Sequence, residues 1–492
     1  MAVVRGELRL LKLRSTPHDP SAAVRAGLTA LGRIGRLHYG STVATNALLE
    51  RRGGPVLLLT TAGFEDVLEI GRQVRPKLYA LEPRRPAPLV PRARRIGLHE
   101  RVLADGTVEH PLGPREIGRA VAAARGVSSV AVCLLHSYAA PAHERRVGRA
   151  LAGRGLHVTL SHRLLREYRE YERVATTVLN AYVGPAMAHH LGALAVLLGG
   201  DLRIMQSSGG LVGARIARAE PVRTILSGPA GGVVGAAERA RRGRLGPVIT
   251  LDMGGTSADV SLVDGGPAYR TDTTIAGLPV RIPAIDIHTV GAGGGSLARL
   301  DAGGALHVGP ESAGADPGPA CYGRGTAATV TDANLVLGRL VETEFLGGEM
   351  RLDRTRAERA IRILARQLGR GVVSAAAGVV RVVNATMERA VRVITVERGH
   401  DPAAFTLVAF GGAGPLHAAE LAEGLGIRRV YVPRHPGLLS AWGVAAAEMV
   451  RDYGETLRVI EPATRVLDAA FRRLGRGARR DLVRDGVAGA RL

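Results

Sequence analysis

The sequence predicts an α/β protein in which strands and helices form layers. Short apolar segments of strand character alternate with segments of helical period along most of the 492 residues. Several of these strands run into glycine-rich turns, where the backbone can approach a phosphate or a neighbouring element closely. Apolar residues make up 46% of the chain and charged residues 22%, as in well-packed globular proteins. A chain of this length exceeds what one core usually serves, so we expect two to four domains.

The first third of the chain alternates strands with helices. Strands are expected at residues 7–13, 56–60 and 130–135. Helices are expected at residues 22–31, 116–124 and 143–152. The dipeptide Asp105-Gly106 is a hairpin signal. Cys133 lies inside an apolar strand, which favours a place in the core over a reactive role.

A long helical stretch follows at residues 164–198. We expect a break near Gly184-Pro185, because proline removes a helical hydrogen bond. This stretch marks the crossing into a second domain. Further on, residues 226–237 form a glycine-rich turn that feeds a helix of small residues. Such glycines permit either close packing of a helix on a sheet or close approach to a nucleotide, and their spacing leaves both interpretations open.

The centre of the chain carries a strand, a tight turn and a second strand at residues 251–263. Gly254 and Gly255 would let successive N–H groups form an anion-binding nest. The hydroxyls of Thr256 and Ser257 could donate to phosphate oxygens. Asp252, at the end of the strand, could hold Mg²⁺ through water. An ordinary glycine-containing hairpin is the alternative, because short glycine motifs are weak signals on their own.

Two later segments carry further candidate residues. Asp286 and His288 alternate along an expected strand, so they would face the same side and could form half a metal site or an acid/base pair. A purely structural role is the alternative for this pair. The second segment is a buried strand at residues 405–410 that ends in a glycine turn and a helix start at residues 411–418. It is typical of a nucleotide-binding element.

The charge of the chain argues against a nucleic-acid partner. The formal net charge of +22 would suit a polyanion binder. Only Lys12 and Lys77 are lysines, however, and the arginines are spread along the whole chain. Aromatic residues make up 3%, too few for base-stacking surfaces. We therefore expect neither a nucleic acid nor a membrane as partner.

Location and cysteine chemistry follow from two expected absences. We expect no apolar run long enough to span a bilayer and find no signal-peptide pattern at the N-terminus, so we expect a cytoplasmic protein. Cys133 and Cys321 are too few for a disulfide framework and are expected to be free thiols. No Cys/His cluster has zinc spacing.

Together these segments resemble the hydantoinase/oxoprolinase family, in particular its ATP-dependent N-methylhydantoinase A type of subunit. The matching stretches are residues 40–52, 167–181, 227–232, 251–262, 286–296, 312–323, 331–334 and 410–417. The resemblance implies a two-lobed actin-like ATPase fold with the nucleotide between the lobes. It implies ATP and Mg²⁺ as cofactors, and ring opening of a cyclic amide such as 5-oxoproline or a hydantoin after phosphorylation of its carbonyl oxygen. A B-type partner subunit and a homo- or hetero-oligomer are implied as well.

Position by position, the resemblance assigns the candidate residues. Catalytic roles fall on Asp252, Asp286 and His288, with Asp252 also as the metal ligand. The phosphate and nucleotide positions are Gly254, Gly255, Thr256, Ser257, Asp259, Gly411, Gly412 and Gly414. Phosphoryl transfer needs positioning and charge neutralisation more than a protein nucleophile, which agrees with this set of residue types.

The family pattern also sets domain boundaries and alternatives. We expect an N-terminal lobe at residues 1–163, an ATP-binding catalytic domain at 164–455 and the start of a C-terminal region at 456–492. Members usually carry an earlier acidic-Gly-Gly-Thr hairpin that is absent here, so we expect a chain truncated at both ends, with an incomplete first lobe and weak ATP turnover. A subunit of an acetone-type carboxylase and a catalytically impaired nucleotide-binding fragment are the alternatives.

Overall fold

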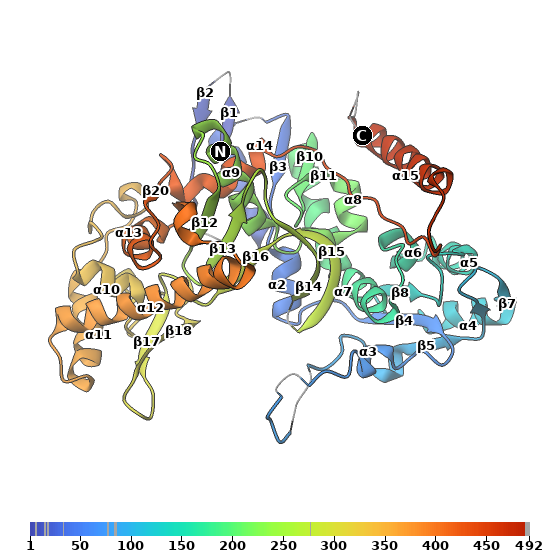
Figure 1. The fold of residues 1–492 in the computed structure, drawn as a ribbon, viewed down its shortest axis with the longest axis horizontal. Coiled ribbons are helices and arrows are strands. Elements are labelled where there is room, and N and C mark those ends of the chain that lie inside the picture. Colours follow the sequence, from blue (N-terminus) through green and yellow to red (C-terminus); the bar gives the residue numbers. More distant parts are fainter. Residues whose placement is uncertain are drawn as a thin grey trace. The chain divides into compact units, whose positions relative to one another are not determined.

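The chain folds into two compact units, each assembled from several stretches of sequence (Figure 1). The computed structural model describes residues 1–4, 7–13, 16, 19–32, 34–75, 78–82, 86–275 and 277–487. Unit 1 comprises Met1–Arg14, Gly228–Tyr269 and Ile285–Ala447. Unit 2 comprises Ser15–Ser227, Arg270–Ala284 and Glu448–Leu492. The expected domain boundaries follow continuous stretches instead, and they stay a prediction.

Unit 1 is built on a five-stranded mixed sheet with the order β16-β13-β12-β19-β20. Strand β13 is antiparallel to β12 and β16, whereas β19 runs parallel to β12 and β20. The strands are β12 (Val248–Met253), β13 (Ala258–Val263), β16 (Ile287–Val290), β19 (Thr406–Phe410) and β20 (Arg429–Tyr431). Because β12 and β19 are parallel neighbours, their C-terminal ends lie at the same edge of the sheet.

The two faces of this sheet differ because side chains alternate along each strand. One face carries Leu251, Val260 and Ala409, which belong to a buried apolar cluster shared with four helices. Those helices are α10 (Val330–Val336), α11 (Arg354–Gln367), α12 (Val372–Ile394) and α13 (Gly414–Gly424). They lie together beside the sheet in Figure 1. The opposite face carries Asp252 and Asp259, and helix α9 (Ser227–Gly243) packs over it.

The remaining elements of unit 1 surround this sheet. They are β1 (Ala2–Val4), β2 (Glu7–Arg9), β17 (Ser296–Leu300), β18 (Leu306–Ser312), α14 (Leu439–Ala446) and the short 3-10 helices η3 (Ala320–Tyr322), η4 (Phe345–Gly348), η5 (Val396–Arg398), η6 (Pro402–Ala404) and η7 (Pro436–Leu438). Strands β1 and β2 pair with each other, as do β17 and β18. Strand β14 (Tyr269–Ile275) leads from unit 1 into unit 2.

Unit 2 contains a four-stranded parallel sheet with the order β5-β4-β8-β9. Its strands are β4 (Val56–Thr61), β5 (Arg95–Leu98), β8 (Ser129–Cys133) and β9 (His157–Leu160). Helices α4 (Pro114–Ala123), α5 (Ala142–Leu151) and α7 (Glu170–Leu198) pack against it. A second sheet, β11-β10-β3, is formed by β3 (Arg36–Tyr39), β10 (Asp201–Met205) and β11 (Leu211–Gly213).

Shorter elements complete unit 2. They are α1 (Pro20–Leu31), α2 (Val43–Leu49), α3 (Val67–Ile70), η1 (Arg92–Arg94), β6 (Arg101–Val102), β7 (Val108–His110), α6 (Ser161–Leu164), α8 (Ala214–Ala219), η2 (Pro221–Thr224), β15 (Leu278–Ile285) and α15 (Thr464–Arg484). The hairpin expected at Asp105-Gly106 is confirmed, because it joins β6 to β7 and Gly106 has a φ of 94°. Cys133 and Cys321 are buried free thiols, as expected.

Helix α7 corrects two expectations. It continues through Gly184 and Pro185 without a break, because the helix on both sides of this dipeptide is buried in the core. It is also long and apolar enough to cross a membrane, so the expectation that no such run exists is wrong by length and composition. In its most apolar window 44% of the residues are buried within the fold. Core helices meet the same criterion, so α7 is weak evidence for a membrane span.

Candidate functional site

The central hairpin brings two carboxylates opposite each other. In the register of β12 and β13, Asp252 pairs with Asp259, and residues 254–257 form the turn. The N–H of Gly254 donates to the carbonyl of Ser257 at 3.0 Å. Among the described residues, the N–H groups of Gly255, Thr256 and Ser257 have no acceptor. The turn therefore offers three free backbone donors, as an anion-binding nest requires. The acidic pair lies next to these donors.

Asp252 ionises with difficulty in this setting. Burial, and then the neighbouring Asp259, raise its pKa to about 7, while a hydrogen bond from Ser440 acts in the opposite direction. The Ser440 hydroxyl donates to Oδ2 of Asp252 at 3.4 Å. Such a group exists as a mixture of acid and carboxylate near neutral pH. A bound cation would shift it to the carboxylate.

Asp259 has a partner on the next strand. Burial raises its pKa, and the Thr289 hydroxyl, which donates to Oδ1 at 2.5 Å, lowers it. Asp252, Asp259 and Thr289 thus form a polar row across β12, β13 and β16. Two adjacent carboxylates with raised pKa values fit Mg²⁺, which is typically held by one or two carboxylates together with substrate phosphates. Among the described residues, no three or more His, Cys, Asp or Glu side chains lie close enough together to hold a metal ion by themselves.

A second glycine segment supports the turn from the side. The N–H groups of Gly294 and Gly295 donate to the carbonyls of Gly254 and Gly255 at 2.9 and 2.6 Å. A Cβ on Gly293 would lie 2.5 Å from the backbone nitrogen of Thr256, so a side chain cannot be accommodated there. These glycines fix the position of the turn through backbone contacts.

The third glycine segment, after β19, reaches the same edge of the sheet. Gly411 has a φ of 83°, and a Cβ there would lie 2.4 Å from Oδ1 of Asp252. The N–H of Ala413 donates to the carbonyl of Met253 at 2.9 Å, and Gly414 begins α13. The structure therefore brings the hairpin and the glycine turn at residues 411–414 together.

Three of the glycines at this edge face open space. A Cβ added at Gly255 or Gly412 would meet no atom within 4 Å, and one at Gly254 would meet only the carbonyl of Ser257 at 4.0 Å. The packing of the chain itself does not require glycine there. The open space leaves room for a ligand to approach the backbone.

The glycine-rich helix α9 serves packing. A Cβ on Gly235 would lie 2.6 Å from the carbonyl of Leu439, and one on Gly443 would lie 1.8 Å from the carbonyl of Gly231. A Cβ on Gly232 would lie 2.7 Å from the ring of Phe410 and 3.2 Å from the carboxylate of Asp252. Of the two interpretations left open by the sequence, the structure supports close packing, of α9 with both α14 and the sheet.

Asp286 and His288 lie apart from the carboxylate pair. His288 pairs with Val260 across β13 and β16, which places it on the face of the sheet opposite to that of Asp259. Asp286 is buried and forms an ion pair with Arg398 of η5. The structure thus does not bring these two residues together with Asp252. The ion pair of Asp286 with Arg398 instead connects the chain just before β16 to η5. Their catalytic roles stay predictions.

Sequence reasoning did not single out Thr289 or Ser440. Thr289 follows His288 directly, and the strand alternation that pairs Asp286 with His288 also puts Thr289 on the other face. Only the register with Asp259 could identify its role. Ser440 lies 188 residues from its partner Asp252, and no local signal in the sequence marks it.

Comparisons with known proteins cover the whole chain. The hydantoinase/oxoprolinase family model matches residues 173–453, and the model of the hydantoinase/oxoprolinase N-terminal region matches residues 1–155. The caprolactamase subunit alpha of Pseudomonas jessenii is 39% identical over 92% of this chain and 69% of its own length. The 5-oxoprolinase 1 of Arabidopsis thaliana is 37% identical over 86% of this chain, which spans 37% of that relative.

Two solved structures resemble the chain over nearly its full length. The ATP-dependent caprolactamase from Pseudomonas jessenii has a TM-score of 0.86 at 36% identity, covering 100% of this chain and 76% of that one. The nucleotide-free acetone carboxylase has a TM-score of 0.79 at 31% identity, covering 97% and 74%. The expected α/β, two-lobed actin-like ATPase fold is confirmed. By family model, identity and fold, this chain belongs to the hydantoinase/oxoprolinase family.

Proposed function

We propose that this chain is the ATP-dependent A-type subunit of an enzyme that opens a cyclic amide, such as 5-oxoproline or a hydantoin, by hydrolysis. The observation that carries the proposal is the meeting of the hairpin turn, with its free N–H groups, and the Asp252–Asp259 pair at one edge of a sheet. Relatives named caprolactamase and 5-oxoprolinase support this reaction class.

The turn at residues 254–257 would bind phosphate. Its free N–H groups and the hydroxyls of Thr256 and Ser257 can donate to phosphate oxygens. Gly411, Gly412 and Gly414 would form the nucleotide side of the site, because their turn contacts Asp252 and Met253. Positioning and charge neutralisation of this kind are the main protein contributions to phosphoryl transfer.

Asp252 and Asp259 would hold Mg²⁺. The cation would neutralise the charge that develops on the transferred phosphoryl group. Thr289 orients Asp259 and Ser440 contacts Asp252, so the carboxylates face each other before any ligand arrives. Because the pKa of Asp252 is raised to about 7, cation binding should strengthen as the pH rises through this value.

The reaction balances with one ATP and two waters. The amide carbonyl oxygen attacks the γ-phosphorus, and the bond to the β-phosphate oxygen breaks, releasing ADP. One water then adds to the activated carbon and the ring C–N bond breaks, which leaves a free amine and an acyl phosphate. A second water adds to the acyl carbon and displaces phosphate. The products are ADP, phosphate and an open-chain molecule that carries an amine and a carboxylic acid.

A B-type partner subunit and assembly into an oligomer are part of the proposal. The relative from Pseudomonas jessenii is named as a subunit, and so is a gamma subunit of acetophenone carboxylase from Aromatoleum aromaticum that is 36% identical over 93% of this chain. We accordingly expect full turnover only when the partner is present.

A carboxylase subunit is the second candidate. The resemblance to acetone carboxylase, at a TM-score of 0.79, favours it specifically. Both reactions would begin with phosphorylation of an oxygen, so the nucleotide site would be the same. They differ in the acceptor and in their dependence on bicarbonate.

The test is phosphate release from ATP and Mg²⁺ by the 492-residue chain, alone and with its B-type partner. Substrates are 5-oxoproline, hydantoin and caprolactam, against acetone or acetophenone with bicarbonate. Gly255→Val fills the open space at the turn, so phosphate could no longer reach the backbone donors, and turnover should fall by about a hundredfold, as when a preorganised donor is lost. Gly266→Val, at another glycine whose Cβ would meet nothing within 4 Å, is the matched control and should have no effect.

Stimulation by a cyclic amide that Gly255→Val abolishes and Gly266→Val preserves would support the hydrolase. Stimulation only by a ketone with bicarbonate would move the assignment to the carboxylase. No stimulation by either class, with equal activity in both variants, would contradict the nucleotide site.

A further inference from the structure

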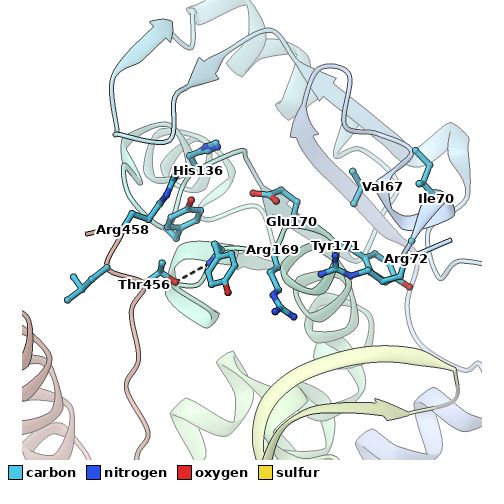
Figure 2. A pocket seen from close by; sticks show the side chains of 13 residues that line it. Val67, Ile70, Arg72, His136, Arg169, Glu170, Tyr171, Thr456 and Arg458 are labelled. Atoms are coloured by element: carbon cyan, nitrogen blue, oxygen red, sulfur yellow. Dashed lines mark hydrogen bonds between the residues drawn. The ribbon is translucent and has the colours of Figure 1, made fainter. Parts of the chain in front are cut away.

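A cavity of about 740 Å³ lies within unit 2, and all the residues that line it belong to that unit (Figure 2). Its walls come from α3, from the loop after β8, from the start of α7 and from the extended segment at residues 456–458. This volume lies within the range of sites for small organic molecules.

The topology of the parallel sheet explains why the cavity forms there. In chain order the strands run β4, β5, β8, β9, but in the sheet β4 lies between β5 and β8. The connections that leave β4 and β8 therefore run in opposite directions and open a crevice at their carboxyl ends. Ligands of open α/β sheets bind at such a topological switch point. Val67 follows β4 and His136 follows β8, and both line the cavity.

The loop after β8 is held firmly in place. Arg173 of α7 is fully buried and donates to the Ser137 hydroxyl at 2.5 Å and to the carbonyl of Leu134 at 2.9 Å. Its guanidinium also lies 5.4 Å from the centre of the Tyr138 ring. Tyr138 and His136 therefore line a preformed cavity wall.

Two residues of the wall have unusual backbone conformations. His136 has a φ of 55° and Arg169 a φ of 75°, values that side-chain-bearing residues adopt at a cost. Such conformations are concentrated at ligand sites, where the surrounding structure maintains them. Both occur on loops of the same cavity.

Charges of both signs line the cavity, where Glu170 interacts electrostatically with Arg72 and His136 at distances longer than an ion pair. Within the described part of the chain, the side chains of Arg169 and Arg458 form no ion pair, and the side chain of Glu170 forms neither an ion pair nor a hydrogen bond. Arg72, by contrast, is neutralised by Glu172 at 2.6 Å. Figure 2 shows Glu170 at the start of α7, with Arg458 and His136 to one side of it and Arg72 to the other.

The cavity wall also contains aromatic side chains. Tyr138, Tyr168 and Tyr171 line it, and the guanidinium of Arg169 lies 5.6 Å from the centre of the Tyr168 ring. The Thr456 hydroxyl accepts a hydrogen bond from the N–H of Tyr168 at 3.2 Å, which ties the extended segment to this wall. The lining thus combines unpaired guanidinium groups, an unpaired carboxylate and aromatic faces.

We propose that this cavity binds a small open-chain molecule that carries both a carboxylate and an ammonium group. The guanidinium group of Arg458 would bind the carboxylate, and Glu170 would bind the ammonium. The assignment of this ligand as the reaction product rests on the proposed function, because hydrolytic ring opening of a cyclic amide yields an amine and a carboxylate on one molecule. The site itself rests on the cavity and its charges.

The test is calorimetric binding to the 492-residue chain without nucleotide, at pH 7. The probes are 6-aminohexanoate, hexanoate, which lacks the ammonium, and hexylamine, which lacks the carboxylate. We expect 6-aminohexanoate to bind about tenfold or more tightly than either, the effect of one hydrogen-bonded charge. Glu170→Gln should reduce its affinity to that of hexanoate, and Arg458→Gln to that of hexylamine. Arg115→Gln on α4 is the matched control and should bind as the unchanged chain does.

Equal binding of hexanoate and 6-aminohexanoate would overturn the proposal, and so would an absence of binding by all three probes. Arg458 lies in an exposed, extended segment, so its variant tests the site even where Glu170→Gln alters the start of α7. Because the assay contains no nucleotide, its failure is distinct from a failure of the ATP-dependent reaction. If 6-aminohexanoate binds but the chain hydrolyses no cyclic amide, the site is supported, and only the statement that its ligand is the reaction product is contradicted.

Discussion

The residue that sets the chemistry of the candidate site is Asp252. It lies opposite Asp259 in the hairpin, and both carboxylates are partly buried. Two such groups repel each other unless a proton or a cation lies between them. In the chain without ligand a proton fulfils this role, and with Mg²⁺ and a nucleotide the cation would replace it.

The ionisation of Asp252 predicts a pH-dependent effect of Asp252→Asn on stability. The folded state raises its pKa from 3.8 to about 7, so ionisation destabilises the fold. Below pH 3.8 the group is protonated in both states and the substitution should have little effect on the free energy of unfolding. The stabilisation by Asn should grow as the pH rises and level off above pH 7, at up to about 4 kcal/mol. Urea unfolding between pH 4 and pH 8 measures it.

The control for this prediction is Asp264→Asn, in the exposed turn after β13. It should change the free energy of unfolding by less than about 0.5 kcal/mol at every pH. Asp252→Asn should also abolish the stabilisation that Mg²⁺ with ATP gives to the unchanged chain. A stability gain independent of pH would show that Asp252 is already ionised in the fold.

At the scale of elements, the site depends on turns whose glycines have two different functions. Gly293 and Gly411 are glycine because neighbouring backbone or carboxylate atoms lie where a Cβ would be, at 2.5 and 2.4 Å. Gly255 and Gly412 face open space, so the fold tolerates a side chain at these positions. Packing explains the first pair, and the proposed approach of a ligand would explain the second.

This division predicts opposite results for Gly411→Ala and Gly412→Ala. Gly411→Ala should lower the free energy of unfolding by about 1 to 3 kcal/mol, because alanine must adopt a φ of 83° and displace Asp252. Gly412→Ala should keep the stability and weaken binding of ATP with Mg²⁺. Thermal unfolding and nucleotide calorimetry on the two variants separate these effects. Unchanged nucleotide affinity in Gly412→Ala would place the phosphates elsewhere.

For the whole molecule, the central feature is that each unit has its own sheet and its own apolar cluster. Unit 1 contains the cluster around Ile249 and Leu251, and unit 2 contains clusters around Leu58 and Leu59. Two such units can unfold in separate steps, so the free energies of unfolding predicted above refer to unit 1, which contains Asp252, Asp264 and Gly411. A ligand stabilises the part of the fold to which it binds, by an amount that grows with its concentration relative to its dissociation constant.

The two proposed sites therefore predict distinct hydrogen-exchange patterns. A non-hydrolysable ATP analogue with Mg²⁺ should slow exchange in peptides covering residues 251–259 and 411–414. The ligand 6-aminohexanoate should slow exchange in peptides covering residues 134–138 and 166–172. Hexanoate serves as the control ligand for the second pattern. Protection of residues 134–138 by the nucleotide, without protection of residues 251–259, would contradict the assignment of the phosphate site to unit 1.

The sequence by itself determined the local parts of this protein. The hairpin with Asp252, Gly254 and Gly255 and the turn at residues 411–414 were readable because a strand that ends in glycines needs no distant partner to define it. The order of these motifs also sufficed for the family, and the alternation of strands and helices sufficed for the α/β class.

The tertiary structure decided what depends on partners far along the chain. Asp286 finds Arg398 at a separation of 112 residues, and the glycines of α9 find Gly443 of α14. Strand register placed Asp259 beside Thr289 and His288 on the other face, since a shift of one residue reverses every side chain. The cavity at β4 and β8 follows from strand order, which is set by long-range packing energies that no local pattern of residues encodes.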